Sequence, residues 1–249
     1  MELKKTILAL SLTTTMLFSS AGSVSANSSL TSTNTGLSGI LKLQPDISKQ
    51  ELLSDVQTIA ANTGQSEQSV IDQIYTELKN DEAKGLKEKA ASSEVTAYGG
   101  SGGTKSVGAS TKGNFYYTPS QTAYLNHGHV GMYYTSTTIV ESVPSAGVRT
   151  ISTAARKVDS SGAMVKSVKT TTANRNNAAN WTKSQVGQSY SYNFATNRQT
   201  GHSGAKNCSK LIWSAYKLNG SLDLDVDGGL GVYPRDVRDA KITTLVRNI

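Results

Sequence analysis

Cys208 is the only cysteine in this chain, and its position suits chemistry. It begins a stretch, Cys208–Leu218, whose apolar residues recur at helical spacing, and Asn207 before it is a candidate N-cap. The free N–H groups and the dipole of a helix N-terminus favour the thiolate, which is the form of cysteine that attacks carbonyl groups. We therefore expect either a nucleophile for covalent catalysis or a cysteine packed as a small apolar residue.

A cysteine nucleophile requires a base, and the chain has three histidines, His127, His129 and His202. His129 begins an apolar run, His-Val-Gly-Met-Tyr-Tyr, in which a polar residue is out of pattern, and Glu141 interrupts the next apolar run. If the two runs form a hairpin that turns about Thr135, Glu141 lies directly across from His129 on one face. The sequence therefore predicts that Glu141 orients His129, the base for Cys208.

Helical patterns in the first part of the chain and mostly strand-like patterns in the second predict an α+β fold. Ser48 and Ser66 precede two amphipathic helices, and Gly64 ends the first of them. Short runs rich in Tyr, Val, Ile and Thr follow, with two further helical patterns. The strands are expected at 115–117, 129–134, 139–143, 148–152 and 164–168, and the helices at 174–186 and 208–218.

The composition divides the chain into four parts. Residues 1–26 have the charged start, apolar run and small-residue exit of a secretory signal peptide. Residues 27–95 are expected to hold a disordered lead, 27–40, and then a helical segment whose role is open between pro-segment, partner-binding hairpin and spacer. Residues 96–112 form a Gly- and Ser-rich linker, and residues 113–249 form the domain that carries Cys208. We therefore expect a secreted protein, free outside the cell or associated with the cell wall.

Charge is distributed unevenly between these parts. Residues 27–95 carry 6 Lys against 10 Asp and Glu, a net charge of −4, whereas residues 96–249 carry 17 Lys and Arg against 7 Asp and Glu, a net charge of +10. A basic domain outside a cell is attracted to anionic surfaces, so anionic cell-wall polymers or an anionic lipid surface are expected partners. No interleaving of Arg with aromatic residues indicates a dedicated nucleic-acid site.

Two patterns resemble metal sites without completing them. Asp223–Gly228 imitates the start of a calcium-binding loop, but Pro234 stands at the twelfth position, where a bidentate Glu is required. His127, His129 and Cys208 lack a further spaced ligand for zinc. We therefore expect a solvated acidic turn, no metal and no other cofactor.

Four short blocks resemble the permuted papain-fold amidases of the YaeF/YiiX/YebB type, within the NlpC-like superfamily of cell-wall endopeptidases. The blocks are Gly128–Tyr133, Val140–Ser142, Gly187–Tyr190 and Cys208–Trp213, and the resemblance covers residues 113–244. In that family the His strand precedes the Cys helix, as it does here. The resemblance implies a circularly permuted papain-like (NlpC-like) domain with Cys208 as nucleophile, His129 as base and Glu141 as orienting group.

The resemblance also implies two substrate-binding positions and an activity. Tyr190 matches a family tyrosine near the nucleophile, and Asn207 stands where members often carry Tyr. The expected activity is that of a cysteine peptidase or amidase, a hydrolase that acts through a thioester on peptide or amide substrates, with peptidoglycan stem peptides favoured. An acyltransferase or lipid hydrolase of the same fold, and a non-catalytic wall-binding or interaction protein, are the alternatives.

Overall fold

The computed structural model describes residues 35–91, 103–119, 126–159 and 161–249. The predicted signal peptide and residues 96–102 of the predicted linker lie outside these residues. The described residues belong to one compact unit. Among the residues described, no helix has the length and apolar character needed to cross a membrane.

Three helices come first, and two of them begin where the sequence predicts. They are α1 (Thr35–Leu43), α2 (Lys49–Thr63) and α3 (Glu67–Ala90). Ser48 and Ser66 cap α2 and α3, because each hydroxyl accepts the backbone N–H three residues further on, at 3.0 and 3.1 Å. Gly64 ends α2 with a φ of 71°, a conformation that glycine adopts at little cost.

Helix α1 was not expected, because it begins inside the stretch 27–40 that was predicted to be a disordered lead. Its Leu37 and Ile40 are buried, and the helix contacts α3. The prediction is therefore wrong for residues 35–40. The stretch is rich in Ser, Thr and Gly, and its only helical signal is the apolar pair Leu37 and Ile40 at i, i+3 spacing. Packing of this pair against α3 stabilises the helix.

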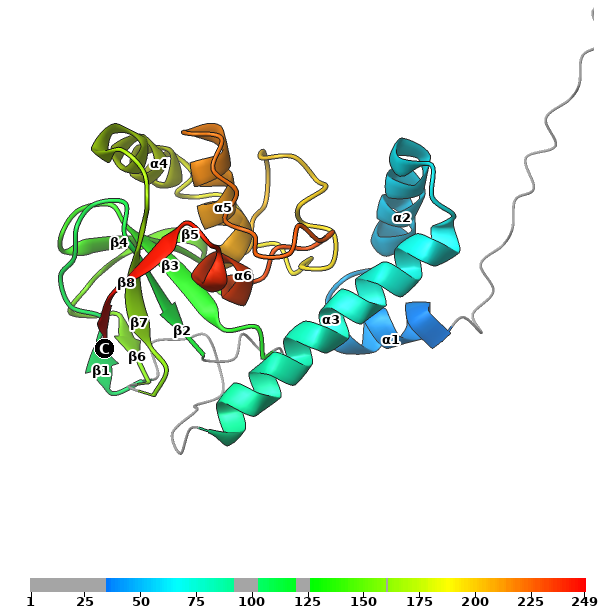
Figure 1. Cartoon of the computed structure of the whole chain (residues 1–249), viewed down its shortest axis with the longest axis horizontal. Coiled ribbons are helices and arrows are strands. Elements are labelled where there is room, and N and C mark those ends of the chain that lie inside the picture. Colours follow the sequence, from blue (N-terminus) through cyan, green and yellow to red (C-terminus); the bar gives the residue numbers. More distant parts are fainter. Residues whose placement is uncertain (1–34, 92–102, 120–125, 160) are drawn as a thin grey trace, which may run out of the picture. The chain divides into compact units, whose positions relative to one another are not determined.

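A six-stranded antiparallel sheet organises the second part of the chain, with strand order β5-β4-β3-β2-β7-β8 (Figure 1). Its strands are β2 (Phe115–Thr118), β3 (His129–Tyr133), β4 (Thr138–Val143), β5 (Gly147–Ser152), β7 (Met164–Val168) and β8 (Thr243–Asn248). A separate pair joins β1 (Lys105–Ser106) to β6 (Lys157–Val158). Strand β1 lies inside the predicted linker, and Val107 after it is buried in a cluster with Tyr116 and Val158. Helix and antiparallel sheet together make an α+β fold.

Helix α5 is fixed against the sheet by both apolar and polar contacts. The helices of this part are α4 (Thr172–Ser184), α5 (Cys208–Leu218) and α6 (Pro234–Asp239), and α5 contacts α4, α6, β3 and β4. Leu211 packs with Val140 and Val148, and truncation of such a buried leucine to Ala costs about 2–5 kcal/mol. Ser142 of β4 donates a hydrogen bond to Lys206 O at 2.6 Å, just before α5. These contacts fix the N-terminus of α5, and with it Cys208, beside the β3–β4 hairpin.

Candidate active site

The β3–β4 hairpin has a different register from the one predicted. Met132 pairs with Val140, so continuing the ladder by one residue puts Glu141 opposite Gly131. The prediction that Glu141 lies directly across from His129 is therefore wrong by two positions.

The position of the turn explains this difference. Residues 134–137 connect the strands, and the backbone N–H groups of Tyr134 and Thr135 donate to Thr138 O at 2.9 and 3.2 Å. The hairpin is thus centred on Ser136 rather than Thr135, and moving the centre by one residue moves every pair by two. Because side chains alternate with a period of two, Glu141 stays on the same face as His129.

The structure brings together the predicted nucleophile, base and orienting residue. His129 Nε2 lies 3.0 Å from Glu141 Oε2, and Cys208 acts on the same imidazole, because its negative charge and hydrogen bonding raise the pKa of His129. Because Nε2 faces the carboxylate, Nδ1 is the ring nitrogen left for the thiol. Cys208 and Glu141 are 0% exposed and His129 is 1% exposed. We call these three residues the Cys–His–Glu cluster.

Glu141 has more partners than the sequence indicated. Its Oε2 accepts a hydrogen bond from Tyr116 OH at 2.5 Å and lies 2.9 Å from Arg156 Nε. Its Oε1 accepts two bonds from Arg149, from Nε at 3.0 Å and from Nη2 at 2.8 Å. Both carboxylate oxygens are therefore occupied by donors, which fixes the side chain in one orientation.

These contacts shift the pKa values of the cluster. Burial on its own raises the pKa of Glu141, but the hydrogen bond from His129, the charge of Arg156 and the bond from Tyr116 hold it well below its usual range. Burial lowers the pKa of His129, yet the negative charge and hydrogen bonding of Cys208, together with those of Glu141, raise it above its usual value. An ionised Glu141 therefore lies beside an imidazole whose protonated form is favoured.

Gly131 is required by the close approach of Tyr116 to the hairpin. A Cβ atom at Gly131 would lie 2.5 Å from Tyr116 Cε1 and 3.1 Å from Ile139 Cγ2. Tyr116 is in register with Gly131 on the neighbouring strand, so its ring lies over the glycine and its hydroxyl reaches Glu141. The glycine in the His-Val-Gly motif therefore makes room for the tyrosine that holds the carboxylate.

Asn207 caps α5, as the sequence predicts, and is buried in a polar network. Its Oδ1 accepts hydrogen bonds from three groups, and its Nδ2 donates to Asn193 O at 3.0 Å. The three donors are Lys210 N at 3.0 Å, Asn197 Nδ2 at 3.2 Å and Ser209 Oγ at 3.2 Å. Asn207, which the sequence placed among the substrate-binding residues, thus sets the position and direction of the first turn that carries Cys208.

Tyr190, the other predicted substrate-binding residue, lies in the connection between α4 and α5. Its ring meets that of Tyr192 edge to face, with centroids 4.9 Å apart. Both side chains are partly exposed, so the pair offers aromatic surface in the segment that leads to Cys208.

The other two histidines lie outside the Cys–His–Glu cluster. His127 Nδ1 contacts the carboxylate of Asp81 in α3, and its Nε2 lies 3.4 Å from Gln44 Nε2. His202 Nδ1 lies 2.9 Å from Ser214 Oγ, and burial together with nearby lysines lowers its pKa. His129 is therefore the histidine that the fold brings to Cys208.

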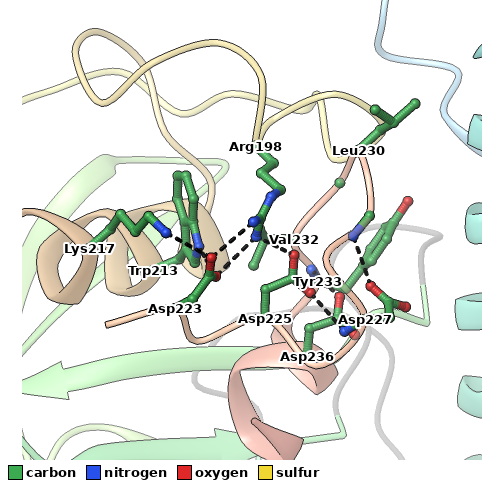
Figure 2. Close-up of polar contacts among 12 residues, drawn as sticks. Arg198, Trp213, Lys217, Asp223, Asp225, Asp227, Leu230, Val232, Tyr233 and Asp236 are labelled. Carbon is green, nitrogen blue, oxygen red and sulfur yellow. Dashed lines mark hydrogen bonds and ion pairs between the residues drawn. The ribbon is translucent and has the colours of Figure 1, made fainter. Parts of the chain in front are cut away.

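The acidic turn after α5, residues 223–228, forms ion pairs with the side chain of Arg198 (Figure 2). Arg198 bonds both Asp223 oxygens, at 3.0 and 2.9 Å, and Asp225 Oδ2 at 2.6 Å. Carboxylate oxygens of Asp225, Asp227 and Asp236 lie within 4.8 Å of one another. Burial, together with the negative charges of Asp227 and Asp225 and opposed in part by a backbone hydrogen bond, raises the pKa of Asp236 to about 8. Arg198 therefore offsets part of the negative charge that the turn concentrates.

The sequence missed the three residues that hold Glu141, namely Tyr116, Arg149 and Arg156. Arg149 had a signal, because it is directly opposite Glu141 on β5 and a cross-strand pair of opposite charges follows from the β4–β5 hairpin. Tyr116 was one of several aromatic residues in a strand, and Arg156 lies beyond β5. Their contacts with Glu141 depend on tertiary packing that no local pattern reports.

Comparison with known proteins gives a relative but no activity. No protein-family model matches the chain, and no solved structure matches it. The chain is 46% identical over 210 residues to the uncharacterized protein YycO of Bacillus subtilis, a match that spans 84% of this chain and 85% of the relative. Identity at that level over most of both chains places them in one family. This chain therefore belongs to the family of the uncharacterized protein YycO.

Proposed function

We propose that this protein is a secreted cysteine hydrolase of amide bonds. The observation that carries the proposal is the buried contact of His129 with both Cys208 and Glu141. The order of the chain, with the His strand before the Cys helix, supports a permuted papain-like arrangement. The N-terminal pattern of residues 1–26 supports export.

In the proposed reaction His129 accepts the thiol proton, and the Cys208 sulfur attacks the substrate carbonyl to form a C–S bond. The backbone N–H of Cys208, at a helix start that has no intrahelical acceptor for it, donates to the developing oxyanion. The C–N bond then breaks, and imidazolium His129 gives its proton to the leaving amine. Water, deprotonated by His129, attacks the thioester and releases the acid and the thiol.

The proposed substrate class is a peptide or amide, with cell-wall stem peptides first. The positive charge of residues 96–249 supports an anionic setting such as the wall. The experiment compares peptide and amide substrates with an acyl-chain substrate.

The test incubates the purified protein with muropeptides, with peptide amides and with phospholipid vesicles, for wild type and Cys208→Ala. We expect release of amine from muropeptides or peptide amides by wild type alone, and a covalent adduct that mass spectrometry detects and hydroxylamine removes. If acyl chains are released from vesicles and no amine is released from the peptide substrates, the protein is a lipid hydrolase rather than an amidase. If neither protein turns over any substrate and both have the same biological effect, the protein is a binding protein rather than an amidase.

A further inference from the structure

Helices α1–α3 form a helical segment, residues 35–90, that has an apolar core of its own. Both α1 and α2 contact α3. The buried apolar side chains of the three helices include Leu37, Ile40, Leu52, Val56, Val70, Ile71 and Ile74. The apolar faces of the helices are thus largely used within the segment.

The contacts between this helical segment and the sheet domain, residues 103–249, are rich in ion pairs. Asp81 and Glu88 of α3 pair with Arg235 at 3.2 and 3.1 Å, and Glu88 also pairs with Arg238 at 2.5 Å. The acidic partners come from the helical side and the basic partners from the sheet domain, in keeping with the opposite net charges of the two parts. Breaking such a buried pair on one side leaves an uncompensated buried charge, so the two parts are costly to separate at these residues.

One group of these contacts holds residues 193–196, in the connection between α4 and α5. Asp55 Oδ2 accepts hydrogen bonds from Asn193 Nδ2 at 3.0 Å and from Thr196 Oγ1 at 2.5 Å. Gln44 Oε1 accepts the backbone N–H groups of the two residues that follow Asn193, at 3.0 and 3.2 Å. Asn193 O in turn accepts the Nδ2 bond of Asn207, the cap of α5. A single residue, Asn193, therefore links the helical segment to the start of the nucleophile helix.

A second group reaches the strand that carries the base. His127, two residues before His129, lies 3.4 Å from Gln44 Nε2 and packs on Phe194 with ring centroids 4.8 Å apart. Gln44 is itself 1% exposed, so its contacts are desolvated. Gln44 thus contacts both the chain before His129 and the chain before Cys208.

We propose that the helical segment is an intramolecular cover that keeps the Cys–His–Glu cluster closed, and that substrate reaches Cys208 when the cover releases residues 193–196. The cluster is at most 1% exposed in this arrangement, so a peptide cannot contact the sulfur without movement of the surrounding chain. The helical segment opposes that movement, because Asp55 and Gln44 accept hydrogen bonds from residues 193–196 while Asn207 donates a hydrogen bond to Asn193 O. The surface of the basic sheet domain that includes residues 193–196 is thus covered by the chain's own acidic helices.

The test measures access to Cys208, which is the only thiol in the chain. Full-length wild type, Gln44→Ala and Asp55→Ala are alkylated with a maleimide that carries a polyethylene glycol chain. Gln44→Ala removes the acceptor of two buried N–H groups, whose pairing favours the closed state, so we expect alkylation to be about tenfold faster. Asp72→Ala is the matched control, because Asp72 is an exposed carboxylate of α3 bonded to Gln68 within the same helix, and its rate should equal that of wild type.

Hydrogen exchange separates release of the cover from general unfolding. We expect faster exchange in residues 191–200 of both variants, with β3 and β4 exchanging as in wild type. Unchanged alkylation in both variants would overturn the proposal, as would faster alkylation accompanied by faster exchange throughout the sheet. Both measurements are independent of enzymatic turnover. If the variants expose Cys208 as expected but no amide is hydrolysed, the proposed function is contradicted and the proposal of a cover still holds.

Discussion

The side chains of His129 and Glu141 meet diagonally across the β3–β4 hairpin, with Nε2 and Oε2 3.0 Å apart. The residue directly opposite the glutamate is Gly131, which has no side chain to stand between them. The missing Cβ also admits the ring of Tyr116, whose hydroxyl reaches the same carboxylate. The alignment of the imidazole therefore depends on a glycine as much as on the two partners.

Replacing Gly131 tests this dependence. The Cβ of Gly131→Ala would meet Tyr116 Cε1 at 2.5 Å, so the ring must shift and its bond to Glu141 weakens. We expect the free energy of unfolding to fall by about 1–3 kcal/mol in chemical denaturation, the range for overpacked cores, and Cys208 reactivity to fall with it. Thr150→Ala, at an exposed position of β5, should change stability by less than about 0.5 kcal/mol. Wild-type behaviour of Gly131→Ala would show that Tyr116 does not need this space.

The imidazole titration of His129 should depend on Cys208. The negative charge of Cys208 is among the main causes that raise the pKa of His129, so its removal in Cys208→Ala should lower that pKa. The change can be followed by NMR of the histidine ring protons against pH. His202 is an internal control, because burial and nearby lysines, rather than Cys208, account for its lowered pKa. A His129 titration that is the same in both proteins would contradict the proposed ion pair.

Glu141 should make stability depend on pH in a defined direction. Its folded-state pKa lies below the unfolded value of about 4.3, so its charge contributes stability above that pH and the contribution is lost as pH falls. At pH 7 we expect Glu141→Gln to lose about 3–5 kcal/mol, because the buried ion pairs of Glu141 with Arg156 and Arg149 are broken. The gap between the two proteins should narrow as pH falls below about 4. Chemical denaturation curves at several pH values measure this difference in the free energy of unfolding. A difference that widens as pH falls would contradict a lowered pKa for Glu141.

Much of the local structure was predictable from the sequence. Capping serines at Ser48 and Ser66 and the apolar stripe after Cys208 mark helix starts within a residue or two, since caps and periodicity act locally. The shared face of His129 and Glu141 followed from strand alternation together with a hairpin turn centred on a residue.

The register of the hairpin and the contacts between distant segments could not be predicted from the sequence. The register of the hairpin depended on where its turn is centred, and the Ser and Thr residues of 135–137 did not mark that point. Tyr116 and Arg156 reach Glu141 from outside the β3–β4 hairpin, through tertiary packing. The contacts of Gln44 and Asp55 with the chain around Asn193 join segments more than a hundred residues apart, which composition does not report.

The cap of α5 should matter to reactivity beyond its effect on stability. Asn207→Ala removes the bond to Lys210 N and the link to Asn193, so we expect a loss of about 1–2 kcal/mol in unfolding free energy. Cys208 alkylation by iodoacetamide should change as well, because the first turn of α5 loses its fixed direction. Ser66→Ala removes the equivalent cap of α3 and should lower stability without changing that alkylation rate. Equal alkylation in all three proteins would limit Asn207 to a structural role.

The most direct test of the central claim is the pH dependence of Cys208 alkylation by iodoacetamide in wild type and His129→Ala. The thiolate–imidazolium pair predicts a rate that reaches its plateau well below about pH 8.5, where a free thiol ionises, and that loses this plateau in the variant. A rate that rises only near the pH of an ordinary thiol, and is the same in both proteins, would contradict the assignment of Cys208 and His129 as a reactive pair.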